Sequence, residues 1–561
     1  MVGPLGVVGA GTMGAGIAQV AVVAGRRVLI ADAVPGAAER AVGAIRERVK
    51  AQVAKGRLSV DADALQLRAV DSLAELSECE VVIEAVVEDL PSKRALFAEL
   101  EGIVATEAIL ASNTSSLSPT ALAALLAHPQ RLVGLHFFNP VPAMKLVEVI
   151  SGLATAPEVA DAAAELASEW GKTVVRSTAT PGFIVNRIAR PFYAEAWRVY
   201  EEHGTVPDVI DAVLTGAGGF RMGPFALMDL IGHDVNEAVT RSVWAAFGYD
   251  PRFAPSLAQR ALVEAGWFGR KTGRGIYQYG DAGVGAAPVV TPPAGPASAS
   301  ASAETAGPAG PAGSAGSAGS EGPAGPAGAA GSAGVLGEVR NVIEHGFAGA
   351  DGGRGPSPLR PLLERAEVAI VSGDRDDTEA GLPSGLVELP SGMLLAQCEG
   401  ITATSLSAAF EQPVVVVDRM LDAATATAVA IAASDGCPPA ALAEAVGLLR
   451  AAGLDVHVID DTPGLIVTRT VAMLANLAVD ALASHVASEP DIDTAMRFGV
   501  NYPLGPLTWA RQWGLDTVLR ILDSLENWYC DGHYRPSPML RRAALAKRTP
   551  SGGAPLLPRP R

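Results

Sequence analysis

A histidine and a glutamate stand twelve residues apart in two apolar stretches of the sequence: His136 in LVGLHFFNP and Glu148 in MKLVEVI. Each stretch has the composition of a buried strand, so both polar side chains are expected in apolar surroundings. A carboxylate beside an imidazole fixes its tautomer, raises its basicity and stabilises the imidazolium that forms when it takes a proton. The pair therefore predicts a general base acting on an alcohol. The alternative is a histidine whose hydrogen bonds are merely satisfied in a core.

A glycine-rich turn near the start of the chain predicts a dinucleotide site. The run GAGTMG has the G-x-G-x-x-G pattern, with an apolar run before it and helical spacing of apolar residues after it. Glycines permit the tight turn and close approach to a pyrophosphate, while the helix N-terminus offers free N–H groups. Asp32 ends the next predicted strand, where it can accept hydrogen bonds from the ribose and repel a 2′-phosphate. NAD is therefore expected over NADP, unless this is only a structural turn with a surface aspartate. The residues of the predicted site are Gly9, Gly11, Thr12, Met13, Gly14 and Asp32.

Composition limits the class of protein. The chain has 561 residues, 49% of them hydrophobic, and a formal net charge of −17, which argues against nonspecific nucleic-acid binding. Residues 1–25 are uncharged, but glycines interrupt them and the basic pair follows the run, so no membrane or export segment is expected. The cysteines lack metal or redox spacing, which predicts reduced thiols in a cytoplasmic protein and no metal site. They are Cys79, Cys398, Cys437 and Cys530.

Apolar runs alternate with helix-like segments over the first part of the chain, which predicts a Rossmann-type parallel sheet with helices on both faces. From about 182 to 280 the pattern becomes helical. Residues 281–334 are mostly Gly, Ala, Pro and Ser with glycine at every third position from Gly307, too short a run for a persistent collagen helix, so a flexible linker is expected. The strand-like runs of the first domain lie at 5–9, 26–32, 81–86, 108–112, 132–138 and 145–150.

An internal repeat organises the second half. PGFIVNR at 181–187 returns as PGLIVTR at 463–469, 282 residues later, and the same spacing holds without a gap for the residues that follow. One structural unit is therefore used twice. In the second copy Asn186 has become Thr468, and the strand-like runs before it contain no glycine-rich turn, so no second dinucleotide site is expected. The other repeated residues are Asp211, Gly223, Pro224, Gly232 and Asp234, which return as Asp493, Gly505, Pro506, Gly514 and Asp516.

The predicted fold class is α/β plus all-α. Its parts are an NAD-binding Rossmann-type domain at 1–181, a helical domain at 182–280, the linker at 281–334, a degenerate α/β domain without the dinucleotide pattern at 335–462, a second helical domain at 463–545 and a tail at 546–561.

Six motifs follow one another in the first 280 residues: GAGTMGAGIAQ, VIEAVVED, ASNTSSL, GLHFFNPVPAMKLVEVI, PGFIVNR and WFGRKTGRGIY. In order and spacing they resemble the L-3-hydroxyacyl-CoA dehydrogenase family, and both helical parts resemble its C-terminal domain. The whole-chain layout resembles the long bacterial 3-hydroxyadipyl-CoA dehydrogenases of phenylacetate breakdown. The resemblance implies NAD-dependent oxidation of an L-3-hydroxyacyl-CoA to a 3-oxoacyl-CoA, with 3-hydroxyadipyl-CoA or 3-hydroxybutyryl-CoA as substrate in aromatic or fatty acid degradation.

The resemblance also implies roles for individual residues. His136 matches the general base and Glu148 the carboxylate that orients it, while Ser115 and Asn186 match residues that contact the substrate oxygen. The residues alone leave two simpler readings open, namely that SNTSS is a helix-cap cluster and that the basic helix end RERVKAQVAKGRL is a solvated face. Matched positions near the nicotinamide ribose are Glu88, Lys93 and Asn113, and those expected to hold coenzyme A are Lys55 and Arg57, with Lys50 within reach.

Several alternatives stay open. The chain could be a monomer in which the second half replaces a dimer partner, or a homodimer. One alternative is a related β-hydroxyacid dehydrogenase, but these enzymes use a catalytic lysine and would not need Glu148. Another is a non-catalytic NAD-binding structural or sensor protein on the same fold. A third is a second, hydratase activity in the C-terminal half, but that half shows no pair of acidic residues to support it. The cation for a terminal acyl carboxylate could be Arg187, Arg190, Arg221 or none of them.

Overall fold

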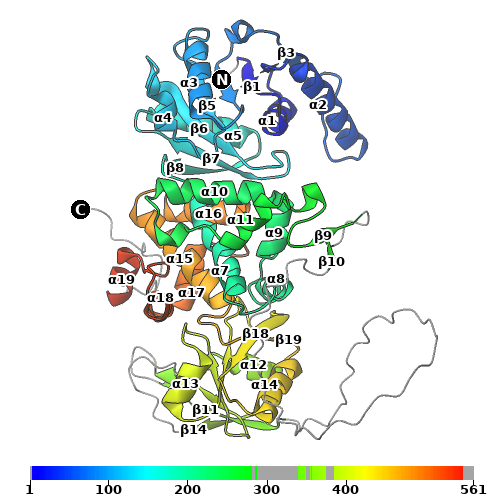
Figure 1. The fold of residues 1–561 in the computed structure, drawn as a ribbon. Helices are drawn as coiled ribbons and strands as arrows, with labels where there is room; N and C mark the ends of the chain where they lie inside the picture. The colour runs from blue at the N-terminus through cyan, green and yellow to red at the C-terminus, as the bar shows by residue number, and fades with distance from the viewer. Residues whose placement is uncertain are drawn as a thin grey trace, which may run out of the picture.

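The computed structural model describes residues 3–280, 285–286, 339–345, 347–348, 354–355, 357–373 and 385–546. Most of the predicted linker and of the predicted tail lies outside these residues. The two sheet regions lie at opposite ends of the molecule, and the helical parts of both halves lie side by side between them (Figure 1). Within the described residues, no helix is long and apolar enough to cross a membrane.

The N-terminal sheet has eight strands in the order β3-β2-β1-β4-β5-β6-β7-β8. Neighbouring strands are parallel except β6 and β7, which are antiparallel. A parallel pair needs a crossover of a dozen or more residues, and the short segment between these two strands contains no helix, so the chain reverses direction instead. The Rossmann-type fold is confirmed, whereas a wholly parallel sheet is not. The strands are β1 (Leu5–Val8), β2 (Val28–Ala31), β3 (Leu67–Ala69), β4 (Val81–Glu84), β5 (Ile109–Ser112), β6 (Leu132–Phe137), β7 (Leu146–Ser151) and β8 (Thr173–Thr178).

Helices cover both faces of this sheet, each over its own apolar core: α1, α2 and α5 on one face, α3 and α4 on the other. Local signals set their ends: the carboxylate of Asp89, for example, accepts the N–H of Ser92 at 2.9 Å and caps α3. The helices are α1 (Thr12–Val23), α2 (Ala37–Ala54), α3 (Leu90–Glu101), α4 (Pro119–Ala123) and α5 (Pro157–Glu169), with 3-10 turns η1 (Leu73–Leu76) and η2 (Pro129–Arg131).

The first helical domain follows directly. Proline stands in the first turn of α7, α8 and α9, where its missing N–H costs nothing. Asp211 accepts the N–H groups of Phe225 and Ala226, each at 2.9 Å, and so caps α9. The elements are α6 (Val185–Ile188), α7 (Arg190–Glu201), α8 (Pro207–Gly216), α9 (Pro224–Ile231), α10 (His233–Ala246), η3 (Pro251–Phe253), α11 (Leu257–Glu264), η4 (Arg270–Thr272), β9 (Gln278–Tyr279) and β10 (Gly285–Ala286).

The second half repeats this plan with a smaller, mixed sheet in the order β14-β11-β15-β16-β17-β18-β19. Its strands are β11 (Asn341–His345), β14 (Ala369–Gly373), β15 (Val387–Glu388), β16 (Leu394–Gln397), β17 (Val414–Val417), β18 (Ala428–Ala433) and β19 (Asp455–Val458), beside a separate pair, β12 (Phe347–Ala348) and β13 (Arg354–Gly355). Its helices are α12 (Arg360–Arg365), α13 (Ala403–Phe410), α14 (Pro439–Ala451), α15 (Val467–Ala483), α16 (Glu489–Gly499), α17 (Pro506–Trp513), α18 (Leu515–Tyr529) and α19 (Pro538–Leu545).

The repeat extends back into the sheets with unchanged spacing, because β18 and α14 begin and end 282 residues after β7 and α5. At this spacing Asp418 stands in the place of His136, and Ala430 in the place of Glu148. The carboxylate of Asp418 accepts the N–H groups of Ile466 and Val467 at 3.0 and 2.7 Å, the equivalents of groups that Glu148 holds in the first half. The second half therefore has no histidine–carboxylate pair at this place.

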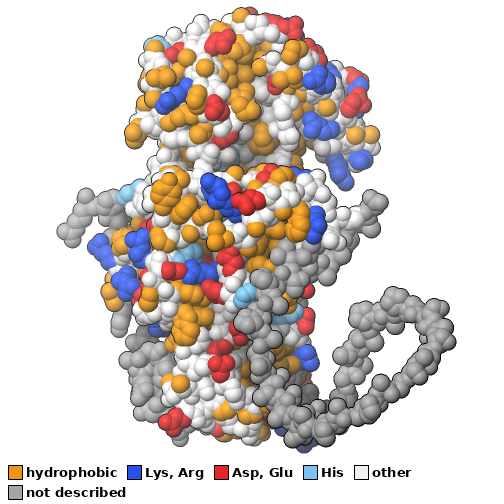
Figure 2. All heavy atoms as spheres, in the orientation of Figure 1, with side chains coloured by type: hydrophobic (Ala, Val, Ile, Leu, Met, Phe, Trp, Pro, Cys, Tyr) orange, Lys and Arg blue, Asp and Glu red, His pale blue; other side chains and the backbone are white. Residues whose placement is uncertain are grey.

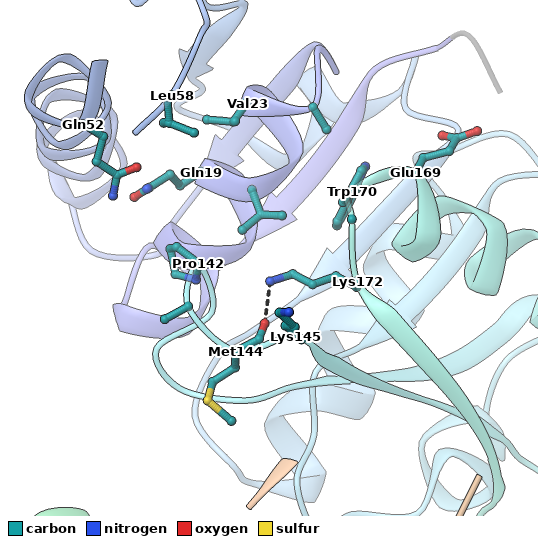
Figure 3. A pocket seen from close by; sticks show the side chains of 14 residues that line it. Gln19, Val23, Gln52, Leu58, Pro142, Met144, Lys145, Glu169, Trp170 and Lys172 are labelled. Atoms are coloured by element: carbon teal, nitrogen blue, oxygen red, sulfur yellow. Dashed lines mark hydrogen bonds between the residues drawn. The ribbon is translucent and has the colours of Figure 1, made fainter. Parts of the chain in front are cut away.

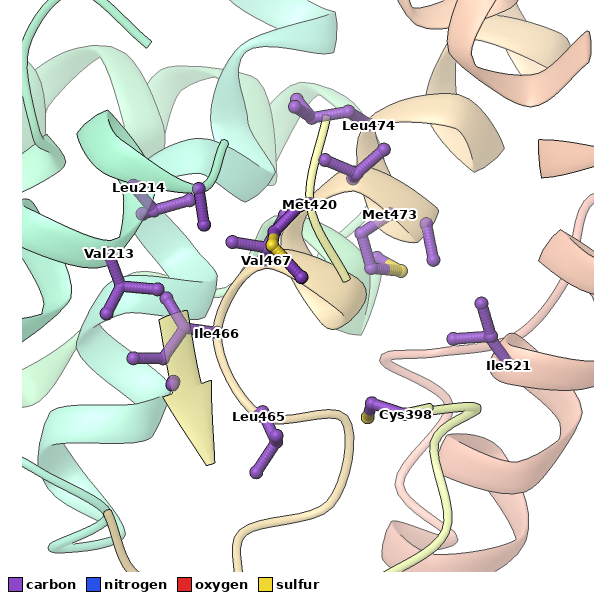
Figure 4. Packing of buried hydrophobic residues seen from close by; sticks show 14 of the residues in the cluster. Val213, Leu214, Cys398, Met420, Leu465, Ile466, Val467, Met473, Leu474 and Ile521 are labelled. Atoms are coloured by element: carbon purple, nitrogen blue, oxygen red, sulfur yellow. The ribbon is translucent and has the colours of Figure 1, made fainter. Parts of the chain in front are cut away.

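The two halves make reciprocal contacts. The N–H of Thr178 donates to the carbonyl of Val486 at 2.8 Å, and the N–H of Asp460 donates to the carbonyl of Gly204 at 3.0 Å; each bond is the other's equivalent under the repeat. Helix α15 packs against α6 and α7, and α16 against β7, β8 and α6. Figure 4 shows Val213 and Leu214 of α8 close to Ile466 and Val467, where α15 begins, and these residues belong to one apolar core that spans both halves. Such reciprocity is typical of a two-fold dimer interface.

Candidate active site

His136 and Glu148 lie directly opposite each other on β6 and β7. Histidine Nδ1 is 2.6 Å from Oε2 of the glutamate, and both side chains are buried. An ionised carboxylate can only accept, so Nδ1 carries the proton and Nε2 keeps a free lone pair. The rings of Phe138 and Phe183 lie 4.4 and 5.9 Å from the imidazole and shield the pair from water. This arrangement can remove a proton from a substrate group that reaches Nε2.

Glu148 also connects the sheet to the helical domain. Its second oxygen, Oε1, accepts the N–H groups of Ile184 and Val185 at 3.0 and 3.1 Å, where α6 begins. The next residue, Asn186, directs its side-chain amide to the backbone carbonyl of Ser115 at 3.4 Å. The structure therefore brings together the four residues predicted for catalysis, although they come from the sheet, a loop and a helix of the next domain.

Glu88 organises the loop that carries Ser115. One of its carboxylate oxygens accepts the hydroxyl of Thr114 at 2.6 Å and the N–H groups of Ser115 and Ser116 at 2.9 and 3.0 Å. Burial opposes ionisation of this carboxyl, but the charge of Lys93 and these hydrogen bonds outweigh burial and lower the pKa of Glu88 to about 2. The alternative interpretation of SNTSS as a helix-cap cluster is not supported, because the next helix, α4, has Ser118 as its N-cap residue and no side-chain cap hydrogen bond. Glu88 holds this loop instead.

Lys93 is 1% exposed, so its side chain offers almost no surface to a cofactor. Its ammonium group lies between the carboxylates of Glu84 and Glu88, at 2.8 and 2.9 Å. Glu84, at the end of β4, was not predicted; the signal was an acidic residue that ends the apolar run VVIE. Asn113 acts on the neighbouring strand, where its side-chain oxygen accepts the N–H of Phe137 at 2.9 Å, beside the histidine.

The glycine-rich turn fits a dinucleotide. A Cβ on Gly14 would lie 1.8 Å from the carbonyl oxygen of Gly9, whereas a Cβ on Gly11 would meet no heavy atom within 4 Å. Position 14 therefore permits only glycine. Position 11 leaves open space at the start of α1, where no side chain caps the N–H groups of the helix. Asp32 accepts the N–H of Ala10 at 2.6 Å, which places its carboxylate beside this turn with capacity for ribose hydroxyls. Thr12 and Met13 form the first turn of α1.

The basic residues predicted for coenzyme A gather at the end of α2, where Figure 2 shows lysine and arginine side chains on the right of the upper domain. Lys50 pairs with Asp63 at 2.9 Å. Lys55 and Arg57 are exposed and form no ion pair within the part of the chain that the structure describes. The predicted solvated face and a phosphate site therefore remain compatible with this geometry.

A pocket of about 520 Å³ adjoins this helix end, between α1, α2 and the segment before β7 (Figure 3). Burial lowers the pKa of Lys172 to about 8, and its ammonium donates to the carbonyls of Val141 and Met144 at 2.5 and 2.8 Å. Gln19 and Trp170 line this pocket, and each has a buried polar atom, Oε1 and Nε1 respectively, without a hydrogen-bond partner. Sequence reasoning missed this pocket because its walls come from four separate segments.

The family models of the 3-hydroxyacyl-CoA dehydrogenases match most of the chain: the NAD-binding domain over residues 4–180, the C-terminal domain over 182–279 and again over 464–553, and the reduced Rossmann-fold domain of 3-hydroxybutyryl-CoA dehydrogenase over 395–463. The 3-hydroxyadipyl-CoA dehydrogenase of Escherichia coli (strain K12) is 40% identical over 548 residues, which are 96% of this chain and 97% of that protein. The chain belongs to the 3-hydroxyacyl-CoA dehydrogenase family. As a family member it is an NAD-dependent oxidoreductase, which confirms the predicted reaction class and cofactor.

Two further relatives bear on the layout of this dehydrogenase. The 3-hydroxybutyryl-CoA dehydrogenase of Bradyrhizobium diazoefficiens is 40% identical over 291 residues, 51% of this chain and 97% of its own. A crystal structure of 3-hydroxybutyryl-CoA dehydrogenase from Escherichia coli K12 is 39% identical, covers 98% of this chain and 99% of its own, and superposes with a TM-score of 0.77. The doubled layout is thus shared with a solved structure, while the relatives' names differ in the acyl chain.

Proposed function

We propose that this dehydrogenase oxidises 3-hydroxyadipyl-CoA or 3-hydroxybutyryl-CoA, with His136 as general base, in cytoplasmic degradation of aromatic compounds such as phenylacetate or of fatty acids. One observation carries the proposal: a single carboxylate, Glu148, holds the buried imidazole with one oxygen and the start of the helix bearing Asn186 with the other. A protein that only senses or stores NAD would not be expected to keep both a histidine–carboxylate pair and an asparagine positioned next to it.

The geometry supports a role for each of these residues. Nε2 of His136 takes the proton of the C3 hydroxyl, and Glu148 stabilises the imidazolium that results. The hydroxyl of Ser115 and the amide of Asn186 donate to the substrate oxygen and stabilise the carbonyl as it forms. Bound NAD supplies the acceptor for the hydride that leaves C3, so the product is the 3-oxoacyl thioester.

In this proposal, the cofactor and coenzyme A bind to separate parts of the sheet domain. Asp32 and the glycine turn fit the adenosine half of NAD. Glu88, which pairs with Lys93, holds the loop that is proposed to lie next to the nicotinamide, and Asn113 links this loop to β6. Lys55 and Arg57 suit the phosphates of coenzyme A, with Lys50 held nearby by Asp63. The adjoining pocket, which contains Lys172, suits part of its pantetheine arm.

The second half serves as an internal partner. In this proposal the chain is a monomer with an intrachain pseudo-dimer, because α15 and α16 occupy the surface of α6 and α7 that a second subunit would need. The reciprocal backbone bonds of Thr178 and Asp460 support it. A homodimer built through another surface stays compatible with the same contacts.

The first assay measures NADH oxidation with acetoacetyl-CoA and 3-oxoadipyl-CoA in parallel. We expect turnover of at least one thioester, and kcat/KM with NADPH roughly 100-fold lower, because a like charge facing Asp32 costs several kcal/mol. Absence of turnover with both thioesters, in protein shown to bind NADH, would contradict the proposed function. Equal rates with NADPH would contradict the placement of Asp32.

Replacing Lys55 and Arg57 together with glutamine is expected to raise KM for acetoacetyl-CoA roughly fivefold to tenfold with little change in kcat, because exposed ion pairs are weak and act on binding alone. The effect should fade at high salt. Arg68→Gln, an exposed position on β3 outside this basic segment, is the control. If KM for a thioester that lacks the nucleotide rises as much as KM for the coenzyme A thioester, these residues do not bind the nucleotide.

A further inference from the structure

Arg190 differs from every other buried cation among the described residues. It is 5% exposed and has no carboxylate partner, whereas each of the others is paired with an acidic residue. The pairs are Lys93 with Glu84 and Glu88, Arg131 with Glu101, Arg187 with Asp480, Arg252 with Asp250, Arg419 with Glu399, and Arg469 with Glu195.

The neighbours of Arg190 are neutral. Its Nε donates to the carbonyl of Asn186 at 2.9 Å, its Nη1 donates to the hydroxyl of Thr240 at 3.0 Å, and the ring of Tyr193 lies 5.0 Å from the guanidinium carbon. A guanidinium stays charged in proteins, and burying a charge without a counter-ion is costly. The site therefore lacks one negative group.

A second buried donor lies near this arginine. Tyr502, from the C-terminal half, is 4% exposed, and its hydroxyl has no hydrogen-bond partner. Its ring packs against Phe192 and Phe220, with centroids 5.6 and 5.0 Å away. Burial raises the pKa of Tyr502 well above its usual value while the charge of Arg190 opposes that rise, so the phenol stays protonated and can donate. The guanidinium of Arg190, which has no counter-ion, and the hydroxyl of Tyr502, which has no acceptor, thus come from different halves of the chain.

The position of Arg190 matches the length of one acyl chain. It follows Asn186 by four residues, across the junction of α6 and α7, and its Nε donates to the carbonyl of Asn186 at 2.9 Å. Its guanidinium therefore lies roughly 5 Å from the side chain proposed to contact the C3 oxygen, as for neighbours four residues apart on one helix face. In an adipyl chain three C–C bonds of about 1.5 Å separate C3 from the terminal carboxyl, a reach of about 4 to 5 Å. A butyryl chain ends one bond beyond C3 and falls short of this cation.

The other two candidate cations are unsuitable. Arg187 is committed to Asp480, with its Nη2 at 3.2 Å from the carboxylate. Arg221 is exposed in the segment between α8 and α9, where water already solvates its charge. Neither would gain much from a substrate carboxylate.

We propose that Arg190, together with the hydroxyl of Tyr502, binds the terminal carboxylate of the acyl chain and selects a six-carbon 3-hydroxy dicarboxylic thioester over an unsubstituted one. The inference rests on the proposed function and names the substrate class of the same site. It also gives the second half of the chain a share in the acyl pocket.

The test compares 3-oxoadipyl-CoA with 3-oxohexanoyl-CoA, which has the same chain length and a methyl group in place of the carboxylate. In the unchanged protein we expect kcat/KM to favour the dicarboxylic thioester. Arg190→Met should lower the ratio of the two values by 30- to 100-fold, Tyr502→Phe by about fivefold, and Arg190→Lys by less than Arg190→Met, because hydrogen bonds to charged groups are stronger than neutral ones. Arg221→Gln is the control and should leave the ratio unchanged.

The melting temperature without substrate separates recognition from folding. Loss of an unpaired buried charge does not destabilise a core, so Arg190→Met should melt within a few degrees of the parent protein. A parallel fall with both thioesters, a large drop in melting temperature, or a parent ratio near one would overturn the inference. Turnover of 3-oxohexanoyl-CoA alone would overturn it and leave the proposed reaction standing, whereas loss of turnover with both would overturn the reaction itself.

Discussion

Replacement of His136 by glutamine is expected to lower kcat for acetoacetyl-CoA reduction by about 10⁴-fold while NADH binds as before. Glutamine keeps a donor for the carboxylate of Glu148 but cannot give or take a proton, and general acid–base catalysis contributes about 10² to 10⁴. The upper value applies here because both side chains are buried and the rings of Phe138 and Phe183 lie against the imidazole, which keeps water from taking over the proton transfer. Stopped-flow or steady-state NADH oxidation measures kcat, and NADH fluorescence measures binding.

His128→Gln serves as the matched control, because this histidine lies in the same domain, outside the site, in the segment before β6. Its kcat should equal that of the parent. If the His136 variant kept more than a few per cent of turnover, another group would be the base, and Glu148 would then only brace the helical domain.

The contact between His136 and Glu148 was predictable because it is local in sequence. Two polar residues in neighbouring apolar runs can face each other if the runs pair. The prediction of a parallel sheet was nevertheless wrong for these two strands, because a short connection makes their pairing antiparallel. The glycine turn was predictable for the same reason, since every contact that excludes a side chain from Gly14 comes from residues close by in the chain. Where chemistry depends on neighbours in sequence, pattern alone suffices.

The support of the Ser115 loop was not predictable, because it joins segments that are far apart in the sequence. Glu88 accepts the N–H of Ser115, 27 residues later in the chain. The ammonium of Lys93 bridges Glu84 and Glu88, and only the fold shows that this lysine is buried. The strand β8 was missed because its outward-facing residues are polar, which breaks the apolar run. Arg190 was one candidate among several, because the absence of a counter-ion is a property of its surroundings and leaves no mark on the sequence.

The charges at the contact between the halves show how far the two copies have diverged. Asp480 pairs with Arg187 and Arg252 of the first half, at 3.2 and 3.3 Å. Under the repeat spacing, the first-half equivalent of Asp480 is Arg198. A homodimer of two first halves would therefore bring Arg198 of each subunit towards Arg187 of the other, so two pairs of like charges would face each other.

A chain ending at Gly280 is consequently expected to aggregate or to form only a weak, poorly active dimer. The first-half side chains that lose their cover include Leu146, Val185, Phe192 and Phe220, which contact Gly499, Tyr502 or Trp509. Exposing each costs about 1.5–3 kcal/mol, so the loss is of the order of 10 kcal/mol, comparable with the whole net stability of a domain. Sedimentation, thermal melting and NADH oxidation measure the outcome, and a well-folded, fully active monomer would refute the role of the second half.

Arg198→Asp distinguishes lost charge pairing from simple lost burial. In the chain ending at Gly280 it should strengthen dimerisation and recover part of the activity, because it restores the equivalent of Asp480 on both subunits. In the full chain it should lower the melting temperature instead, because Arg198 there pairs with Glu202 and Asp531. If the two halves are related as the subunits of a dimer, the substitution should therefore stabilise the shortened chain and destabilise the full chain. If the second half is merely attached, it should change the stability of both chains in the same direction.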